Sequence, residues 1–189
     1  MRNNTYMKFE YMCQKIKGYV GTKKLMEEGF SNRQIAALTV EGYLEKVCQG
    51  YYWISGKQEY KPVDYKCIEV CLSDPKAIIC MKSALYYQGE IEEEPKCLSV
   101  ATKRSDRSRL KMNFPVKRHY FSAGNFEIGM KQKKTEFGCY NIYDAERSIC
   151  DIVRLGGEDV GIEIERYKDK QSYERMMKYA KLLKMKGIY

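Results

Sequence analysis

The sequence predicts an α+β protein in two parts: a small N-terminal winged helix-turn-helix in residues 1–60, and a larger mixed α/β domain with a mostly antiparallel sheet in residues 61–189. Three observations support this prediction. Signals for helix, turn, helix and hairpin follow one another in residues 18–54. A short polar stretch bounded by proline, residues 56–62, comes next. Beyond it, helical periodicities and short strand-like runs follow one another.

The first helix of the two-helix turn is expected in residues 23–28, with Thr22 as its N-cap and Gly29 as the left-handed residue after its end. A preceding amphipathic stretch, residues 6–17, is expected to form a supporting helix that ends at Gly18.

The second helix has a complete start signal. Ser31 and Gln34 have the spacing of a capping box, and Phe30 and Ile35 that of a hydrophobic staple. The first turn of this helix therefore carries Asn32, Arg33 and Gln34. These side chains suit pairing with base edges, and the N-terminal turn of the second helix is the part that enters the major groove in helix-turn-helix proteins.

A change of pattern after Gly42 predicts a two-stranded hairpin, the wing. Residues 43–47 and 51–54 read as strands around a turn at Gln49-Gly50. Such an arrangement also occurs as plain scaffold, but the full order of helix, turn, helix and wing favours a role in DNA binding.

Composition restricts the class of protein and of partner. The 189 residues are 44% hydrophobic, enough for a substantial core. Lys plus Arg number 34 against 25 Asp plus Glu, so the net charge of +9 favours an anionic partner, either nucleic acid or an anionic membrane surface. No apolar run reaches the length of a membrane span and no signal sequence is recognisable, so we expect a soluble, cytoplasmic protein.

The eight cysteines are scattered, with no CxxC pair and a single histidine, His119. This pattern indicates reduced thiols acting as small buried hydrophobes, and we expect neither a metal site nor a cofactor. Motifs for nucleotide binding, serine hydrolases and zinc proteases are absent, so enzymatic function is disfavoured.

Positive charge is concentrated in one region of the second domain. Strands are expected at residues 97–102, 115–121, 126–131 and 135–140. Residues 96–134 hold eleven Lys or Arg against two carboxylates. The densest part, residues 103–109 followed by Lys111, is interpreted as a solvated loop, a surface that follows DNA phosphates, or a docking face for an acidic protein. The candidate residues of the basic region as a whole are Lys103, Arg104, Arg107, Arg109, Lys111, Lys117 and Arg118.

Helices are expected again near the C-terminus. Asp144 is placed to cap a helix over residues 145–155, in which Arg147 and Asp151 pair at i and i+4. Residues 158–167 read as helix or strand, and Ser172 is expected to cap a last helix.

The segment IICMKSALYYQG at residues 78–89, the segment NIYDAERSICDIVRL at residues 141–155 and the wing sequence Gly50-Tyr51-Tyr52 carry a resemblance to a known family. Together with residues 18–54, they make the chain similar to the AbiEi-type antitoxins of abortive-infection toxin–antitoxin systems. The resemblance covers nearly the whole chain in the same order.

This resemblance implies an N-terminal domain that binds inverted repeats in its own promoter and represses it. It also implies a C-terminal domain that neutralises a nucleotidyltransferase-like toxin encoded beside it, with or without a stable complex. Carried over by position, the DNA-binding candidates are Lys23, Lys24, Ser31, Asn32, Arg33, Gln34, Lys46 and Tyr51. Gln49 stands where the family often has arginine, which weakens the case for a strong wing contact.

Glu146, Arg147 and Asp151 recur in the family pattern, but their spacing also fits a structural ion pair, and we favour that interpretation. Two other functions stay open: a regulator without a toxin, and a nucleic-acid-processing enzyme, which needs carboxylates clustered near the basic strands.

Overall fold

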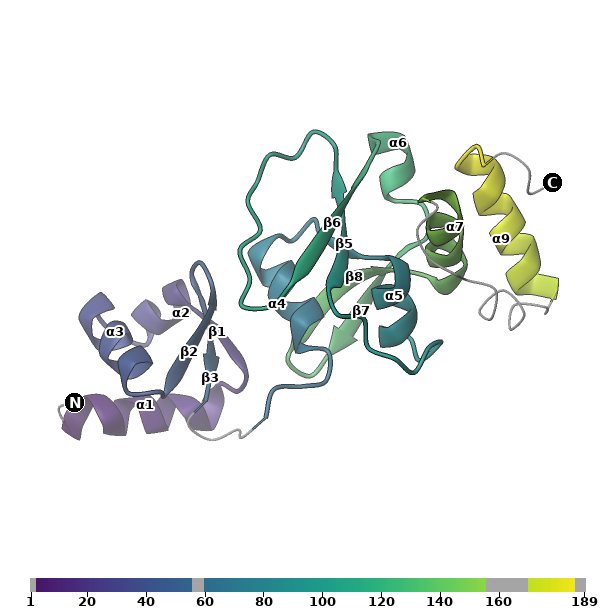
Figure 1. The fold of residues 1–189 in the computed structure, drawn as a ribbon. Helices are drawn as coiled ribbons and strands as arrows, with labels where there is room; N and C mark the ends of the chain where they lie inside the picture. Colours follow the sequence, from purple (N-terminus) through teal and green to yellow (C-terminus); the bar gives the residue numbers. More distant parts are fainter. Residues whose placement is uncertain (1–2, 56–59, 156–169, 186–189) are drawn as a thin grey trace.

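A computed structural model of the chain describes residues 3–55, 60–155 and 170–185 (Figure 1). It is a mixed α+β structure with one sheet in residues 19–54 and another in residues 78–143. In the described part of the chain, no helix has the length and apolar character needed to cross a membrane.

The N-terminal part packs three helices against a small antiparallel sheet in which β3 lies between β1 and β2. Its core is one hydrophobic cluster in which Phe9 and Met12 from the first helix meet Leu25, Ile35 and Leu38. The elements are α1 (Asn3–Lys15), β1 (Tyr19–Gly21), α2 (Thr22–Glu27), α3 (Asn32–Val40), β2 (Leu44–Cys48) and β3 (Tyr51–Ile54).

Turn chemistry in this part follows the sequence signals. Gly29 follows α2 with φ of 83°, and Gly50 in the hairpin turn has φ of 81°, both in the left-handed region that glycine tolerates without strain. Ser31 caps α3 through a capping box with Gln34, as predicted. Thr22 is not the N-cap of α2: Gly21 occupies that position, and the Thr22 hydroxyl donates instead to the Gly50 carbonyl at 3.2 Å.

The C-terminal part is a five-stranded sheet in the order β6-β5-β4-β8-β7, with helices on both faces. Ile79, Val100 and Ile142 pack against α4, whereas Ile78 and Ala101 belong to the cluster that contains α7. The elements are α4 (Tyr65–Ser73), β4 (Ile78–Ile79), α5 (Met81–Tyr87), β5 (Leu98–Lys103), β6 (Val116–Phe121), α6 (Ala123–Phe126), β7 (Met130–Thr135), β8 (Gly138–Tyr143), α7 (Ala145–Leu155) and α9 (Lys170–Leu182).

The prediction of a mostly antiparallel sheet in the C-terminal part is wrong, because this sheet contains both parallel and antiparallel pairs. β4 pairs with β8 and β5 with β6 in parallel, whereas β4–β5 and β7–β8 are antiparallel. Parallel neighbours need a connection that carries the chain back along the sheet. The basic loop, which we define as residues 104–115, makes this return between β5 and β6 (Figure 1).

Several expected elements are also corrected. Residues 126–131, expected as a strand, contain the end of α6 and the start of β7. The strand expected at residues 135–140 is divided between β7 and β8 by a turn. Strand β1 was not predicted, and Ser172 lies inside α9 instead of capping it. The helix or strand expected at residues 158–167 lies outside the described residues.

Candidate nucleic-acid interface

The first turn of α3 is held by side-chain contacts to the scaffold. The Ser31 amide donates to the Gln34 side-chain oxygen at 2.9 Å, and the Gln34 amide donates to the Ser31 hydroxyl oxygen at 3.3 Å. The Gln34 side-chain nitrogen donates to the Thr5 hydroxyl oxygen on α1 at 3.0 Å. Gln34 is therefore a structural residue here, while the neighbouring Asn32 and Arg33 are exposed.

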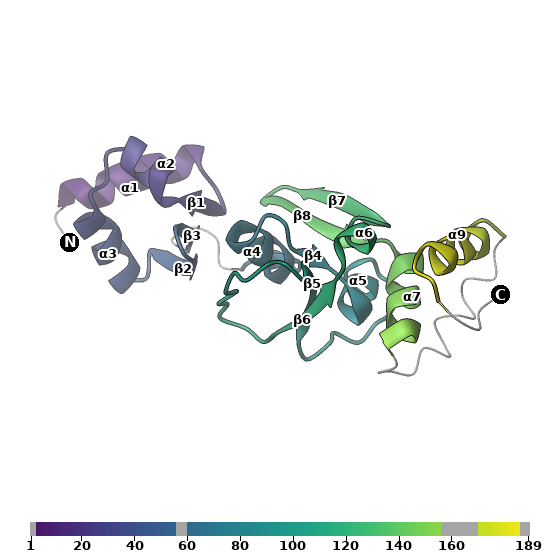
Figure 2. The ribbon, with the colours of Figure 1, turned by 90° about the horizontal axis from the view of Figure 1, so that it is seen from above.

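Helix α3 also has a fixed orientation, because Ile35 and Leu38 are buried in the N-terminal core. In both views α3 lies on the side of the N-terminal part that is remote from the C-terminal sheet (Figures 1 and 2). The Asn32 and Arg33 side chains therefore project from a supported helix into solvent.

The β2–β3 hairpin presents its two faces to different surroundings. Leu44 and Ile54 are paired and belong to the N-terminal core, so the next pair of the same parity, Lys46 and Tyr52, lies on the face that α3 covers. Lys46 is exposed and Tyr52 half-buried. Tyr51 has the opposite parity and packs with Trp53 toward the C-terminal part.

This places the candidate Tyr51 away from α3 and brings Tyr52 beside Lys46. Sequence reasoning missed Tyr52, although the side-chain alternation of a strand next to a buried Trp53 would have indicated it. The hairpin turn is short and is fastened to α2, because the Gly50 carbonyl accepts the Thr22 amide at 2.8 Å.

The two lysines at the start of α2 differ in how much of their charge is available. Lys23 is exposed. Lys24 forms an i,i+4 ion pair with Glu28 at 2.9 Å, and the same contact lowers the pKa of Glu28. We therefore expect Lys23 to offer the stronger contact to an anion.

An aromatic and ionic joint connects the N-terminal sheet to the C-terminal part. The Trp53 ring lies between Tyr19 at 4.9 Å and Phe137 at 5.6 Å, measured between ring centroids. The Lys61 ammonium donates to Glu45 at 2.6 Å and to buried Glu69 at 2.8 Å.

Burial raises the pKa of Glu69, although the Lys61 ammonium opposes this shift. Burial alone disfavours the charge of Lys61, but its two carboxylate partners hold its pKa above the ordinary value.

The last part of the basic loop lies beside the hairpin. The Asn113 side-chain amide donates to the Lys46 carbonyl at 3.1 Å, so the loop touches the exposed edge of β2. In both views, α3, β2 and the basic loop follow one another along the molecule (Figures 1 and 2). The exposed cations of the loop and of β6 are Arg104, Arg107, Arg109, Lys111 and Lys117.

Two of the predicted basic residues are committed to contacts within the fold. Lys103 donates to Glu127 at 3.1 Å and lies over the Phe126 ring. Arg118 donates to the Thr102 hydroxyl and to the Ser108 carbonyl, at 3.2 and 2.6 Å. Lys103 connects the end of β5 to the end of α6, and Arg118 connects β6 to β5 and to the basic loop, so both cations are less available to a partner.

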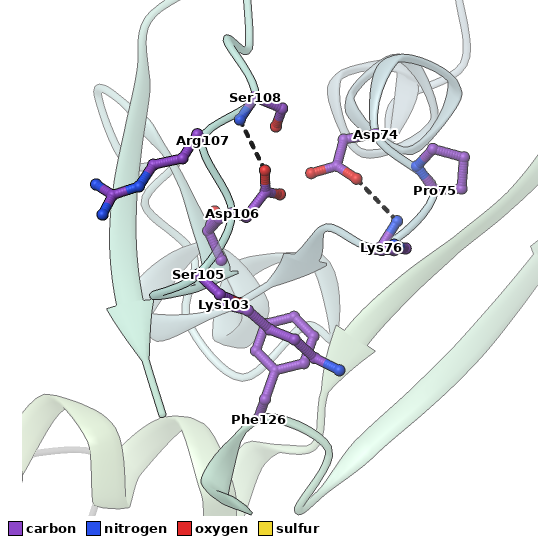
Figure 3. Close-up of a pocket in the computed structure, with 10 residues that line it drawn as sticks. Asp74, Pro75, Lys76, Lys103, Ser105, Asp106, Arg107, Ser108 and Phe126 are labelled. Atoms are coloured by element: carbon purple, nitrogen blue, oxygen red, sulfur yellow. Dashed lines mark hydrogen bonds between the residues drawn. The ribbon is translucent and has the colours of Figure 1, made fainter. Parts of the chain in front are cut away.

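A hollow of about 470 Å³ lies between the basic loop and the end of α4 (Figure 3). Asp74 and Asp106 line it together with Lys76 and Lys103, and the Arg107 guanidinium points away from it. Asp106 accepts the Ser108 amide at 2.7 Å, a contact that lowers its pKa. Because the carboxylates offset the charge of the lysines, the hollow is not a concentrated anion site. The hydrogen bond between Asp106 and Ser108 instead orders the basic loop.

Glu146, Arg147 and Asp151 form buried contacts on α7. Arg147 donates to Asp151 at 2.8 Å and to the Ile128 carbonyl at 2.6 Å, and its guanidinium lies 4.3 Å from the Tyr143 ring centroid. Both Arg147 and Asp151 are fully buried. This geometry fits the interpretation of Arg147 and Asp151 as a structural ion pair.

The same helix is connected to α9. Tyr179 donates to Asp144 at 2.7 Å, and Arg175 donates to Glu146 at 3.0 Å. Asp144 also accepts the Arg147 amide at 2.9 Å, as expected for its capping role. Glu146 therefore helps to hold α9 against α7.

Within the described residues, no group of His, Cys, Asp and Glu side chains has the arrangement of a metal site. His119 lies in β6, where its Nε2 is 3.3 Å from the Ser99 hydroxyl oxygen. Comparison with protein-family models and with curated proteins gives no match for this chain.

Proposed function

We propose that the chain is a DNA-binding repressor whose N-terminal part acts as a winged helix-turn-helix. The observation that carries this proposal is the exposure of Asn32 and Arg33 on the first turn of α3, which the capping box and the Thr5 contact hold in place. Side chains at this position read base edges in the major groove in helix-turn-helix proteins.

Other surfaces support the same assignment. Lys46 lies on the α3 side of the hairpin, and Lys23 is exposed at the start of α2, where a backbone phosphate can be contacted. The basic loop adjoins β2, and it supplies exposed arginines and a lysine for phosphates farther along the duplex.

The test is titration of the full chain with the DNA upstream of its own gene, over a series of salt concentrations. We expect Arg33→Ala to weaken operator binding by about 1–3 kcal/mol and to relax specificity. Lys111→Ala should weaken all sequences alike and lower the salt slope by about one unit.

Val63→Ala, a change in an exposed residue outside α3 and the hairpin, serves as the matched control and should bind normally. Unchanged binding in both test variants would reject the assignment.

The antitoxin role rests on the resemblance to AbiEi-type antitoxins. We propose that the C-terminal part neutralises a nucleotidyltransferase-like toxin encoded next to this chain, and that the chain itself is not an enzyme. The full-length Arg33→Ala variant separates the two roles: it should lose operator binding and still rescue cells that express the neighbouring toxin. If the Arg33→Ala variant folds but does not rescue the cells, DNA binding and toxin neutralisation do not use two independent surfaces. If no such toxin gene is present, the chain is better explained as a regulator without a toxin.

A further inference from the structure

The outward face of α3 offers few chemical groups. Gln34 is bound to Ser31 and Thr5, and the Thr39 hydroxyl donates to the Ile35 carbonyl at 2.9 Å. Ile35 and Leu38 are buried. The groups left on the exposed face are the Asn32 amide, the Arg33 guanidinium, the Ala36 methyl group and the Val40 isopropyl group.

Val40 is the most exposed large hydrophobic residue in the described part of the chain, at 88% exposure. Arg33, Ala36 and Val40 are spaced by three and four residues, so they form one stripe along the helix. Arg33 and Val40 are seven positions apart, which corresponds to about 10 Å along the helix. That length matches about three base pairs at about 3.4 Å each.

We propose that α3 reads thymine methyl groups: Arg33 or Asn32 pairs with a purine edge, and Ala36 and Val40 contact the 5-methyl groups of thymines within the next three base pairs. This inference rests on the proposed DNA-binding function and specifies the operator that it recognises. Among base-pair edges in the major groove, only thymine presents a methyl group, and apolar side chains recognise it by contact.

The charge around the stripe favours DNA over another occupant. Arg33 is exposed at one end, Lys46 is exposed on the adjacent face of the hairpin, and α3 carries no carboxylate from Asn32 to Val40. A groove bordered by phosphates complements both cations, whereas a purely apolar protein partner leaves them unused.

The test removes single methyl groups from the DNA. After footprinting has located the half-site, each of its thymines is replaced by deoxyuracil, which lacks only the 5-methyl group. Binding of the full chain is then measured for wild type, Val40→Ala and the control Val63→Ala, which changes an equally apolar residue of 82% exposure outside α3.

We expect one or two of the substitutions to weaken wild-type binding about threefold to fourfold each, the effect of losing one buried methyl group. Val63→Ala should respond like wild type. Val40→Ala should bind thymine DNA more weakly and lose the response to deoxyuracil at one position, because the contact has already been removed. Deoxyuracil placed outside the half-site should have no effect.

Two outcomes overturn the inference while the proposed function stands. One is equal binding of thymine and deoxyuracil operators by a wild-type chain that still depends on Arg33. The other is a response to deoxyuracil that Val40→Ala retains in full at every position. If Val40→Ala also loses self-association, the stripe of Arg33, Ala36 and Val40 contacts a second copy of the chain. Failure of wild type to bind any duplex rejects the proposed function itself.

Discussion

Replacing Arg147 with alanine should destabilise the C-terminal part strongly. The change removes the 2.8 Å contact to Asp151, the 2.6 Å contact to the Ile128 carbonyl and the packing over Tyr143, all at a fully buried position. Removing one partner of a buried ion pair costs about 3–5 kcal/mol. Asp151 keeps its second partner, Arg154 at 2.8 Å, so we expect the lower end, about 3 kcal/mol.

The matched control is Arg154→Ala on the same helix. Arg154 contacts the same carboxylate at the same distance, but 23% of its side chain is exposed and Arg147 still pairs with Asp151 after the change. We expect a cost of about 1 kcal/mol for this control. Urea unfolding monitored by circular dichroism measures both values, and an unchanged m-value shows that the comparison is valid.

A cost below about 1 kcal/mol for Arg147→Ala, or equal costs for Arg147→Ala and Arg154→Ala, would contradict a stabilising role of the fully buried Arg147 contacts. If Arg147 has only a structural role, the folded fraction of Arg147→Ala should bind operator DNA with wild-type affinity. Specific loss of a C-terminal activity in a stably folded Arg147 variant would instead assign the residue a direct functional role.

Three further predictions address local stability, pH dependence and thiol reactivity. Ser31→Ala should cost about 1 kcal/mol in urea unfolding because α3 loses its capping hydroxyl, whereas Ser31→Asn should keep most of that stability. The raised pKa of Glu69 means that the folded state holds its proton more tightly, so stability relative to Glu69→Gln should fall as pH rises from about 4.5 through the folded pKa; a difference that rises with pH contradicts this sign. A thiol reagent should modify exposed Cys139 rapidly in the native protein, and Cys139→Ser should remove that fast phase. Burial raises the pKa of Cys71 to about 11 and of Cys150 to about 12, so rapid native modification of either would contradict the packing.

Signals that act over a few residues were predicted well. The Ser31–Gln34 capping box, the left-handed Gly29, the Gly50 turn and the Arg147–Asp151 pair are all present. Each depends on hydrogen bonds or backbone angles within four residues of the chain, which the local sequence specifies directly.

Features that depend on distant segments were predicted poorly. The parallel pairing of β5 with β6 depends on the path of the basic loop. The residue pattern of one strand does not specify whether its neighbour in the sheet runs parallel or antiparallel to it. The aromatic and β-branched residues of the segment 126–131 predict a strand, although Phe126 is buried at the end of a short helix.

By itself, the sequence determined where α3 begins, which polar residues occupy its first turn, and where the positive charge is concentrated. Only the tertiary structure decided which of those residues are available. Thr5 on α1 engages Gln34, Glu127 pairs with Lys103, and the joint around Trp53 turns Tyr51 away from α3. The physical reason is that exposure depends on partners brought together by folding, and a residue type alone does not specify them.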